Sequence, residues 1–383
     1  ERKDMINVES FYNTLKSYEI DFFTGVPDSL LKSFCAYISD QEEKSNIIAA
    51  NEGNAIGLAA GYYLSSGKIP LVYMQNSGIG NAVNPLVSLA DKLVYKIPML
   101  LLIGWRGEPG KKDEPQHKKQ GIITVELMES IGISYEVISK DTTNDDIKNV
   151  LKRAYNYMIE TKEPYAIIVR KETFEEYAST CLGDSKNKFE LSREQAIEII
   201  LSEINKESVI VSTTGMASRE LFEIREKRNE GHNKDFLTVG SMGHASQIAL
   251  GIAINKRNTK VYCLDGDGAL IMHMGGMAII GNQNVNNYVH IVINNGAHDS
   301  VGGQKTVGLD IDLLKIAKAC GYKKFYSCVN TSEIRRCLKE INETNELAFL
   351  EIKVNKGARK DLGRPTTTPI ENKNMLMEYL DEI

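Results

Sequence analysis

Residues 261–300 read VYCLDGDGALIMHMGGMAIIGNQNVNNYVHIVINNGAHDS, and this stretch decides the fold class. An apolar run that ends in Gly266-Asp267-Gly268 precedes a helix-like segment, a second apolar run and then Asn294-Asn295. The pattern predicts two buried parallel strands joined by a crossover. Both polar signatures then lie at the carboxyl ends of strands, where open α/β sheets bind ligands. A carboxylate and an amide oxygen side by side, with glycines that permit close backbone approach, suit a hard cation holding a diphosphate.

The same rhythm of apolar runs and helical patterns extends through the rest of the chain, whose 383 residues favour two domains. We expect an α/β protein with two doubly wound parallel-sheet domains, 1–175 and 190–383, and a charged junction from Lys171 to Arg193. The strands predicted in the first domain are Ile20–Phe23, Ile47–Ala50, Pro70–Met74, Met99–Ile103, Tyr135–Ile138 and Tyr165–Val169. Those added to the opening stretch in the second are Val209–Ser212, Phe236–Val239 and Ala348–Val354.

Composition argues against several classes of function, although it leaves a local basic patch for nucleic acid open. The 46 basic and 51 acidic residues give a net charge of −5, which provides no field for nucleic acid. No apolar run is long enough to span a membrane, and we expect no secretion signal because no basic-then-apolar segment stands at the start of this sequence. The cysteines lack CxxC pairs and are expected to be reduced thiols of a cytoplasmic protein: Cys35, Cys181, Cys263, Cys320, Cys328 and Cys337.

Three turns in the first predicted domain carry polar residues that could take part in catalysis or binding. Asp28 follows the first strand, where capping of the next helix is its ordinary role. Glu52 follows the second strand at a helix N-terminus, and interaction with the helix dipole, worth under about 1 kcal/mol, is by itself a sufficient explanation. His117 ends a Gly- and Pro-rich stretch from Gly104 that is either a surface loop or a functional one.

Gly266-Asp267-Gly268, 25 further residues and then Asn294-Asn295 together resemble the cofactor fingerprint of thiamine-diphosphate-dependent enzymes. The resemblance implies that Asp267 and Asn295 bind Mg²⁺ through side-chain oxygens and that Ala297 binds it through its backbone carbonyl, with Asn294 as a neighbour. It also implies contacts between thiamine diphosphate and Thr213, Thr214, Gly240, Met242, Gly266, Gly268 and Ala269.

The same family requires a glutamate in the other domain that hydrogen-bonds to N1′ of the cofactor's aminopyrimidine ring. Asn51-Glu52-Gly53 matches this requirement, which replaces the helix-dipole interpretation of Glu52. The resemblance assigns 1–175 as the pyrimidine-binding domain and 190–383 as the diphosphate-binding domain with a C-terminal tail. Because the family builds its site between these domain types of neighbouring subunits, a homodimer or higher homo-oligomer is implied.

Common decarboxylases of this group carry a middle domain, for which this sequence has no room. The compact arrangement, with Gly104-Trp105-Arg106-Gly107 and Asp361-Leu362-Gly363-Arg364, is similar to the phosphonopyruvate decarboxylase group and its near relatives, the sulfopyruvate decarboxylases. The implied reaction converts 3-phosphonopyruvate to phosphonoacetaldehyde and carbon dioxide, in phosphonate biosynthesis. The alternatives are a sulfopyruvate decarboxylase or another 2-oxo acid decarboxylase or carboligase.

The resemblance also suggests roles at the substrate end of the site. His117 is the first candidate proton donor, ahead of His298 and His244, and Asp28 is expected to order the substrate. The basic residues considered for the phosphonate are Arg106, Lys305, Arg359 and Arg364. A nucleotide-binding regulatory protein is the competitor from another class, and it lacks support because no strand is followed by GxGxxG or GxxxxGK[ST].

Overall fold

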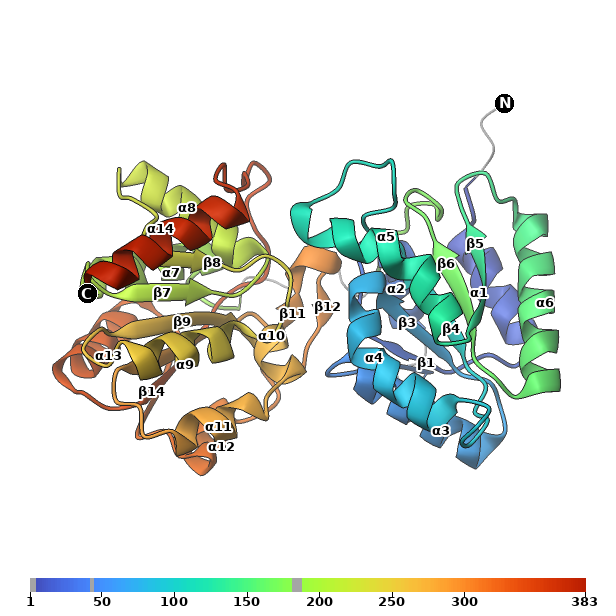
Figure 1. Cartoon of the computed structure of the whole chain (residues 1–383), viewed down its shortest axis with the longest axis horizontal. Coiled ribbons are helices and arrows are strands. Elements are labelled where there is room, and N and C mark those ends of the chain that lie inside the picture. Colours follow the sequence, from blue (N-terminus) through green and yellow to red (C-terminus); the bar gives the residue numbers. More distant parts are fainter. Residues whose placement is uncertain (1–4, 42–44, 181–187) are drawn as a thin grey trace. The chain divides into compact units, whose positions relative to one another are not determined.

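The computed structural model describes residues 5–41, 45–180 and 188–383, and the chain divides into two compact units (Figure 1). Unit 1 comprises Glu1–Asp184 and unit 2 comprises Ser185–Ile383. Part of the predicted junction, together with Cys181, lies outside the described residues. Among the described residues, no helix has both the length and the hydrophobicity that crossing a bilayer requires. The cysteines found free are Cys35, Cys263, Cys320, Cys328 and Cys337.

Unit 1 is built around a six-stranded parallel sheet in the order β2-β1-β3-β4-β6-β5 (Figure 1). Its strands are β1 (Phe23–Gly25), β2 (Asn46–Ile48), β3 (Leu71–Gln75), β4 (Leu100–Gly104), β5 (Ser134–Ile138) and β6 (Tyr165–Val169). Its helices are α1 (Val8–Ser17), α2 (Lys32–Ser39), α3 (Glu52–Ser66), α4 (Ile79–Pro85), α5 (Pro115–Ser130) and α6 (Asn144–Thr161), with short turns η2 (Asn76–Gly78) and η3 (Leu86–Ala90).

Unit 2 contains a second six-stranded parallel sheet, in the order β13-β14-β10-β9-β7-β8. Its strands are β7 (Val209–Ser212), β8 (Asp235–Leu237), β9 (Val261–Gly266), β10 (Tyr288–Asn294), β13 (Lys324–Cys328) and β14 (Ala348–Lys353), beside the antiparallel pair β11 (Ala297–His298) and β12 (Gln304–Lys305). Its helices are α7 (Arg193–Glu203), α8 (Met216–Lys227), α9 (Ala245–Asn255), α10 (Asp267–Met272), α11 (Gly276–Asn282), α12 (Leu313–Cys320), α13 (Thr331–Glu343) and α14 (Pro369–Glu382), with the turn η4 (Asp299–Val301).

The two large sheets have the same strand order. When the strands of unit 2 are counted from β7 in chain order and the sheet is read from β8, both sheets run 2-1-3-4-6-5. The order in which successive strands join the sheet therefore reverses between β1 and β3 in unit 1 and between β7 and β9 in unit 2. Ligands bind outside the carboxyl ends of the strands at such points. The predicted architecture of two doubly wound parallel sheets without a middle domain is confirmed.

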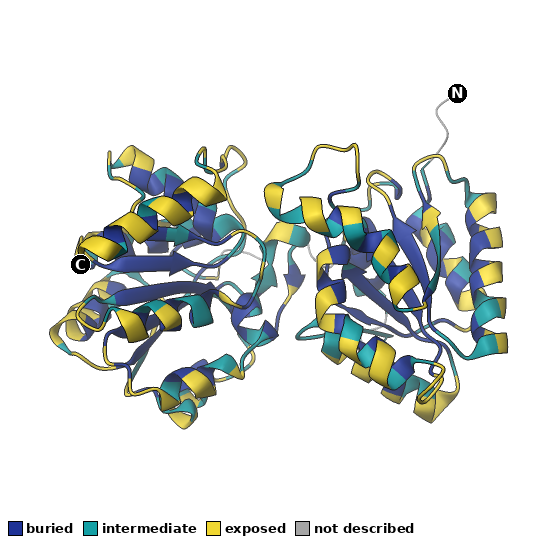
Figure 2. Ribbon diagram, in the orientation of Figure 1, coloured by how far each residue is buried: buried dark blue, intermediate teal, exposed yellow. Residues whose placement is uncertain are grey.

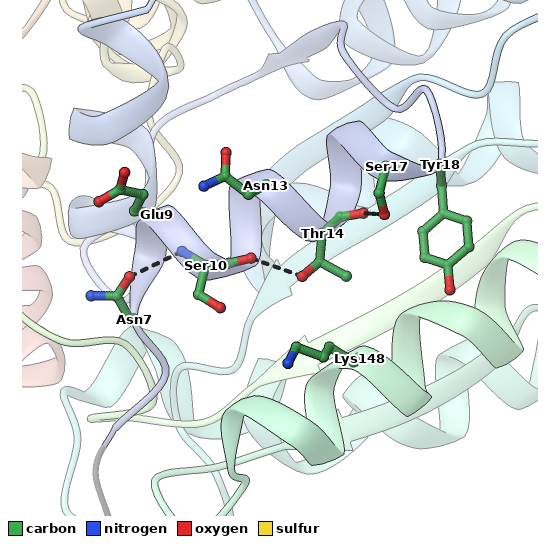
Figure 3. Close-up of a pocket in the computed structure, with 8 residues that line it drawn as sticks. All are labelled: Asn7, Glu9, Ser10, Asn13, Thr14, Ser17, Tyr18 and Lys148. Carbon is green, nitrogen blue, oxygen red and sulfur yellow. Dashed lines mark hydrogen bonds between the residues drawn. The ribbon is translucent and has the colours of Figure 1, made fainter.

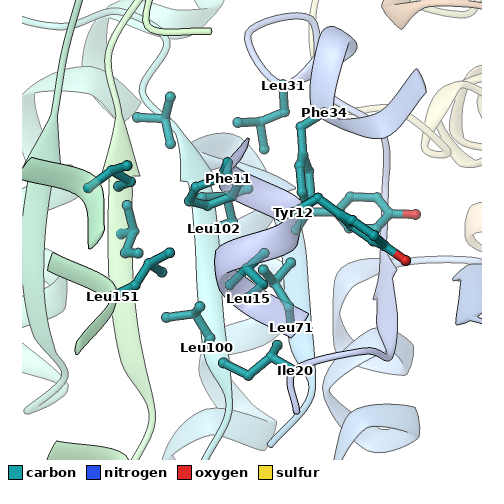
Figure 4. Close-up of a cluster of buried hydrophobic side chains, with 14 of the residues drawn as sticks. Phe11, Tyr12, Leu15, Ile20, Leu31, Phe34, Leu71, Leu100, Leu102 and Leu151 are labelled. Carbon is teal, nitrogen blue, oxygen red and sulfur yellow. The ribbon is translucent and has the colours of Figure 1, made fainter. Parts of the chain in front are cut away.

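Apolar side chains fill both faces of the sheet in unit 1. Leu100 and Leu102 of β4 pack in one cluster with Phe11 of α1 and Phe34 of α2 (Figure 4). Leu101 points to the opposite face, into a cluster shared with α3 and α5. Parallel strands buried on both sides read as continuous apolar runs, which is why the sequence reveals them so clearly. Figure 2 shows the result, with buried strands and helices that expose one side.

Three elements differ from the sequence-based expectation. The first strand begins at Phe23 rather than Ile20, because the N–H of Ile20 closes the end of α1 by donating to Leu15 O at 3.1 Å. The preceding Glu19 has a φ of +57°, which turns the chain out of the helix. The edge strand β13 and the final helix α14 are not predicted. Only Cys328 is buried in β13, so that strand lacks an apolar run.

Candidate active site

Glu52 is the first residue of α3, directly after the N-cap Asn51, whose side chain accepts a hydrogen bond from Asn54 N at 2.9 Å. The turn carries the Glu52 carboxylate inward, so that the residue is only 5% exposed. Asn81 Nδ2 donates to Oε2 of Glu52 at 2.8 Å. The described residues give Oε1 no hydrogen bond, so one carboxylate oxygen is held while the other is left for a ligand.

The turn between β3 and α4 forms a wall around this carboxylate. A Cβ added to Gly78 would lie 2.2 Å from Oε1 and 2.4 Å from Cδ of Glu52, so only glycine fits there. Asn76 anchors the turn, since its buried amide donates to Arg106 O at 2.8 Å and to Thr124 Oγ1 at 2.9 Å. The glycine-rich turn therefore shapes the surroundings of Glu52, and neither Gly78 nor Asn81 was singled out from the sequence for that role.

Asp113 holds Arg106 and His117 together beyond the carboxyl end of β4. Its two oxygens accept from Arg106 Nε at 2.9 Å and Nη2 at 2.6 Å, and His117 Nδ1 lies 2.9 Å from Oδ1. Although burial opposes the shift, these partners lower the pKa of Asp113 well below its usual range. Because Asp113 engages Nδ1, the other ring nitrogen of His117 faces away from it. His117 lies in the first turn of α5, so its assignment to the long loop is wrong; Pro115 at the first helical position begins the helix earlier.

Asp28 is fully buried after β1, at the point where the sheet of unit 1 changes direction. Gln75 Nε2, at the end of β3, donates to Asp28 Oδ1 at 2.7 Å. Burial raises the pKa of Asp28, against the hydrogen bond from Gln75. Arg106 Nη1 donates to Oγ of the adjacent Ser29 at 2.9 Å. The structure thus brings together Asp28, Arg106 and His117, which the sequence proposed separately.

Asp267 opens α10 at the end of β9 in unit 2, and it is 2% exposed. The Thr306 hydroxyl donates a hydrogen bond to its carboxylate. Burial raises the pKa of Asp267 to about 6, against hydrogen bonds from Thr306 and from the backbone of Asn295. None of the largest influences on that pKa is a basic side chain. A buried carboxylate is costly unless a cation pairs with it, so a carboxylate without a basic partner is a good candidate for a metal ligand.

The two adjacent asparagines after β10 have different surroundings. The amide of Asn294 is buried and donates to Gly308 O at 2.7 Å and to Glu351 Oε1 at 2.8 Å. Asn295 is only partly buried, and its Oδ1 accepts a hydrogen bond from Ala297 N at 3.0 Å. An oxygen with two lone pairs can bind a cation in addition to that single donor. Asn294 Oδ1 likewise accepts one hydrogen bond, from Gly296 N at 3.2 Å, so the greater exposure of Asn295 is what agrees with its choice as the candidate ligand.

Residues from three turns surround the start of α10. A Cβ added to Gly268 would lie 3.1 Å from Cε1 of His298 and 3.5 Å from Cε of Met242, so these side chains crowd the glycine. Gly240 has a φ of +66°, and its N–H donates to Thr214 Oγ1 at 2.9 Å. The structure therefore connects two pairs of predicted cofactor residues, Met242 with Gly268 and Gly240 with Thr214.

The remaining predicted cofactor residues lie along the same carboxyl edge of the unit 2 sheet. Thr213 N donates to Leu264 O at 2.7 Å, and Ser218 Oγ donates to Thr213 O at 2.8 Å. Gly266 is the N-cap of α10, and Ala269 is buried within that helix. These contacts fix the backbone between β7 and β9, where the strand order predicts ligand binding.

The two other histidines considered as proton donors have ordinary structural surroundings. Burial lowers the pKa of His298 to about 4, against the charge of Asp299, so the ring is neutral at pH 7. The His244 ring stacks on His273 with 4.5 Å between centroids. Both observations favour packing or orienting roles and leave His117 as the preferred candidate.

The basic residues considered for an anionic substrate are already engaged or exposed. Lys305 Nζ lies 2.7 Å from Asp310 Oδ2. Arg359 pairs with Glu194 and Asp361, each at 3.1 Å, and also with Glu223. Arg364 is exposed in the same C-terminal segment. Arg106 is the member of this set that lies among other candidate catalytic residues. Its guanidinium has five N–H donors, of which Asp113 and Ser29 use three.

The side chains present fit the implied groups. The Asp267 carboxylate, the Asn295 amide oxygen and the Ala297 carbonyl form an all-oxygen donor set, which Mg²⁺ prefers. In unit 1, the unpartnered Oε1 of the buried Glu52 suits a ring nitrogen that needs a hydrogen bond.

A different buried group could also hold a metal by residue type. Ligand atoms of Cys263, Asp265 and His290 all lie within 4.8 Å of one another in the core of unit 2. However, His290 uses both ring nitrogens, with Asp265 Oδ2 at 3.1 Å and Tyr322 Oη at 3.0 Å. We therefore regard this cluster as a satisfied polar network.

A pocket along α1 contains none of the predicted site residues (Figure 3). Its polar groups are largely used by the helix itself. Asn7 Oδ1 accepts from Ser10 N at 3.0 Å as the N-cap, and Thr14 Oγ1 donates to Ser10 O at 2.8 Å. We assign no ligand to it.

Comparison with known proteins agrees with the fold of both units. Residues 7–128 match the family described as thiamine pyrophosphate enzyme, N-terminal TPP binding domain, and residues 211–352 match its C-terminal TPP binding domain. A phosphonopyruvate decarboxylase of Streptomyces viridochromogenes is 31% identical over 380 residues, covering 96% of this chain and 93% of that protein. That of Streptomyces hygroscopicus is 29% identical, covering 99% and 95%. A sulfopyruvate decarboxylase of Methanosarcina acetivorans is 28% identical, covering 97% of each.

Proposed function

The chain belongs to the thiamine pyrophosphate enzyme family, and on this premise we propose that it decarboxylates 3-phosphonopyruvate to phosphonoacetaldehyde and carbon dioxide, with thiamine diphosphate and Mg²⁺. The observation that carries the proposal is its similarity, over nearly the full length of both chains, to two phosphonopyruvate decarboxylases. Such a reaction belongs in phosphonate biosynthesis. We also expect a cytoplasmic enzyme, as the unpaired thiols suggest.

The residues proposed to bind Mg²⁺ and thiamine diphosphate come from both units. Asp267, Asn295 and the carbonyl of Ala297 would bind Mg²⁺, and the turns that contain Thr213, Thr214, Gly240, Met242, Gly266, Gly268 and Ala269 would hold the cofactor. Bound thiamine diphosphate supplies a nucleophilic carbon and an electron sink for loss of carbon dioxide from a 2-oxo acid. Glu52 would hydrogen-bond to the aminopyrimidine ring and control its protonation, which the partnerless Oε1 supports.

The substrate end of the site is proposed to lie with the cluster in unit 1. His117 would deliver a proton from Nε2, while Asp113 holds Nδ1 and fixes the ring. Arg106 would use its two remaining N–H groups on the phosphonate. The buried Asp28 would order this end of the site. Lys305 and Arg359 stay as secondary proposals because acidic side chains pair with them, and Arg364 does so because it is exposed.

A side-by-side assay tests the substrate. Full-length protein with thiamine diphosphate and Mg²⁺ should release carbon dioxide from 3-phosphonopyruvate with a higher kcat/KM than from sulfopyruvate or pyruvate. The preference is expected because a phosphonate carries more negative charge than a sulfonate and suits a bidentate guanidinium. Faster turnover of sulfopyruvate would instead establish the alternative function, which the Methanosarcina relative supports. Formation of a ligated product without aldehyde would indicate a carboligase.

We further propose that the active form is a homodimer or a higher homo-oligomer, with the active site at a subunit interface. Glu52 and Asp267 belong to separate compact units, and the family resemblance implies that neighbouring chains contribute them. Sedimentation at the protein concentration of the assay should give a mass of at least twice 42.7 kDa. An active monomer would contradict this proposal.

A further inference from the structure

The amide of Asn295 is fixed in one orientation by two hydrogen bonds. Its Nδ2 donates to Asp299 Oδ2 at 2.7 Å, and its Oδ1 accepts from Ala297 N at 3.0 Å. A carboxylate only accepts and a backbone N–H only donates, so the two contacts together exclude the flipped amide. Asp299 and the N–H of Ala297 therefore together fix which atom of Asn295 is presented as a ligand.

Asp299 is itself held by groups distant in the sequence. The same oxygen, Oδ2, accepts from Arg193 Nη1 at 2.9 Å and from Gly357 N at 2.9 Å. Arg193 also forms a bidentate pair with Glu220, with N to O distances of 2.7 and 3.1 Å. The side chains of Arg193, Glu220 and Asp299 are 8%, 1% and 10% exposed. Water therefore screens these ion pairs and competes for their hydrogen bonds only weakly.

The charges of this network favour a cation nearby. One guanidinium faces two carboxylates, which leaves one formal negative charge that the network itself does not neutralise. Asp299 also interacts electrostatically with Asp267, the charged member of the candidate donor set. Asp299 thus acts on the cation site in two ways, by orienting an amide ligand and by adding negative potential.

We propose that Asp299, held in place by Arg193 and Gly357, is a positioning residue that sets the affinity of the Asn295 site for Mg²⁺. This inference rests on the proposed Mg²⁺ site, and it assigns a role to a buried network that the reaction itself does not require. Losses of about 10–100-fold in metal affinity are usual when such an outer contact is removed.

The test is a Mg²⁺ titration of full-length protein, with thiamine diphosphate binding measured by calorimetry. Asp299→Ala should raise the Mg²⁺ concentration for half-maximal cofactor binding by about 10–100-fold. Asp299→Asn should have a smaller effect, because its amide oxygen can still accept from Asn295 while the charge is lost. If the alanine variant does not fold, the asparagine variant must still show a shift beyond twofold.

Asp235 provides a matched control in the same unit. It is also buried and pairs with an arginine, Arg225, with both contacts at 2.9 Å, but the described contacts link it to no residue of the candidate donor set. Asp235→Ala should lower the melting temperature while leaving the Mg²⁺ midpoint unchanged. Equal shifts in both variants, or a wild-type midpoint in Asp299→Ala, would overturn the proposal. Failure of the wild-type protein to bind thiamine diphosphate with Mg²⁺ would instead refute the proposed function.

Discussion

Replacement of Glu52 by glutamine is expected to leave thiamine diphosphate binding measurable but to slow exchange of the cofactor's C2 proton by about 10²–10⁴-fold, the usual contribution of a positioned acid or base. Glutamine has nearly the same shape, and its oxygen can still accept the hydrogen bond that Asn81 donates at 2.8 Å. Its NH2 group would then take the place of Oε1. An amide can donate a hydrogen bond there, but it is neither protonated nor ionised near neutral pH, so it cannot act as an acid or a base.

The exchange rate is measured by NMR after acid quenching of the protein in heavy water. Glu136→Gln is a matched control in unit 1, because Glu136 accepts hydrogen bonds from Arg153 and Tyr165 and lies outside the candidate site. The control should exchange at the wild-type rate. Wild-type exchange in Glu52→Gln would refute the role of Glu52, even if turnover were reduced for other reasons.

Replacement of Asp267 by alanine is expected to abolish Mg²⁺-dependent binding of thiamine diphosphate. Asp267 is the only charged member of the donor set, since Asn295 and Ala297 offer neutral oxygens. Its removal should therefore cost more than the about 10–100-fold in affinity that an outer contact typically supplies. Calorimetry with and without Mg²⁺ measures the effect directly.

Asp267→Asn separates the charge from the packing of this site. The asparagine keeps an oxygen that can accept from the Thr306 hydroxyl, so the fold around α10 should be preserved. We expect it to bind the cofactor far more weakly than the wild type while retaining a cooperative thermal transition. Cofactor binding with the affinity and Mg²⁺ dependence of the wild type in either variant would rule out the metal site.

The strands and turns that could be predicted from the sequence are those whose signal lies within a few consecutive residues. The buried strands were visible because both faces are covered, as for β9 and β10, and the turns that follow them carry the candidate ligands. Glu52 could be singled out only through the family resemblance, because a helix N-terminus alone explains an acidic residue. The final helix could have been predicted, since Thr368 and Glu371 form a capping box and Pro369 is its first residue.

Partners brought together by tertiary structure could not be predicted. Asn81 reaches Glu52 across 29 residues, and Arg193 reaches Asp299 across 106. No periodicity links such pairs, because their distance is set by strand order rather than by spacing along the chain. Asp113 lies only four residues before His117, yet its role depends on a loop conformation that the sequence pattern does not specify.

The strand order common to both units bears on how such a protein can evolve. A doubly wound sheet creates a ligand-binding edge through its topology, before any particular side chain is chosen. Here one edge carries the buried Glu52 and the other carries the proposed oxygen ligands, so the same architecture is proposed to serve a different part of the site in each unit. Selection then needs to preserve a few positions at each edge, while helices and outer surfaces drift as long as the strands remain apolar. A relative that differs at about two thirds of aligned positions, yet aligns over 93% of its length, is the expected outcome.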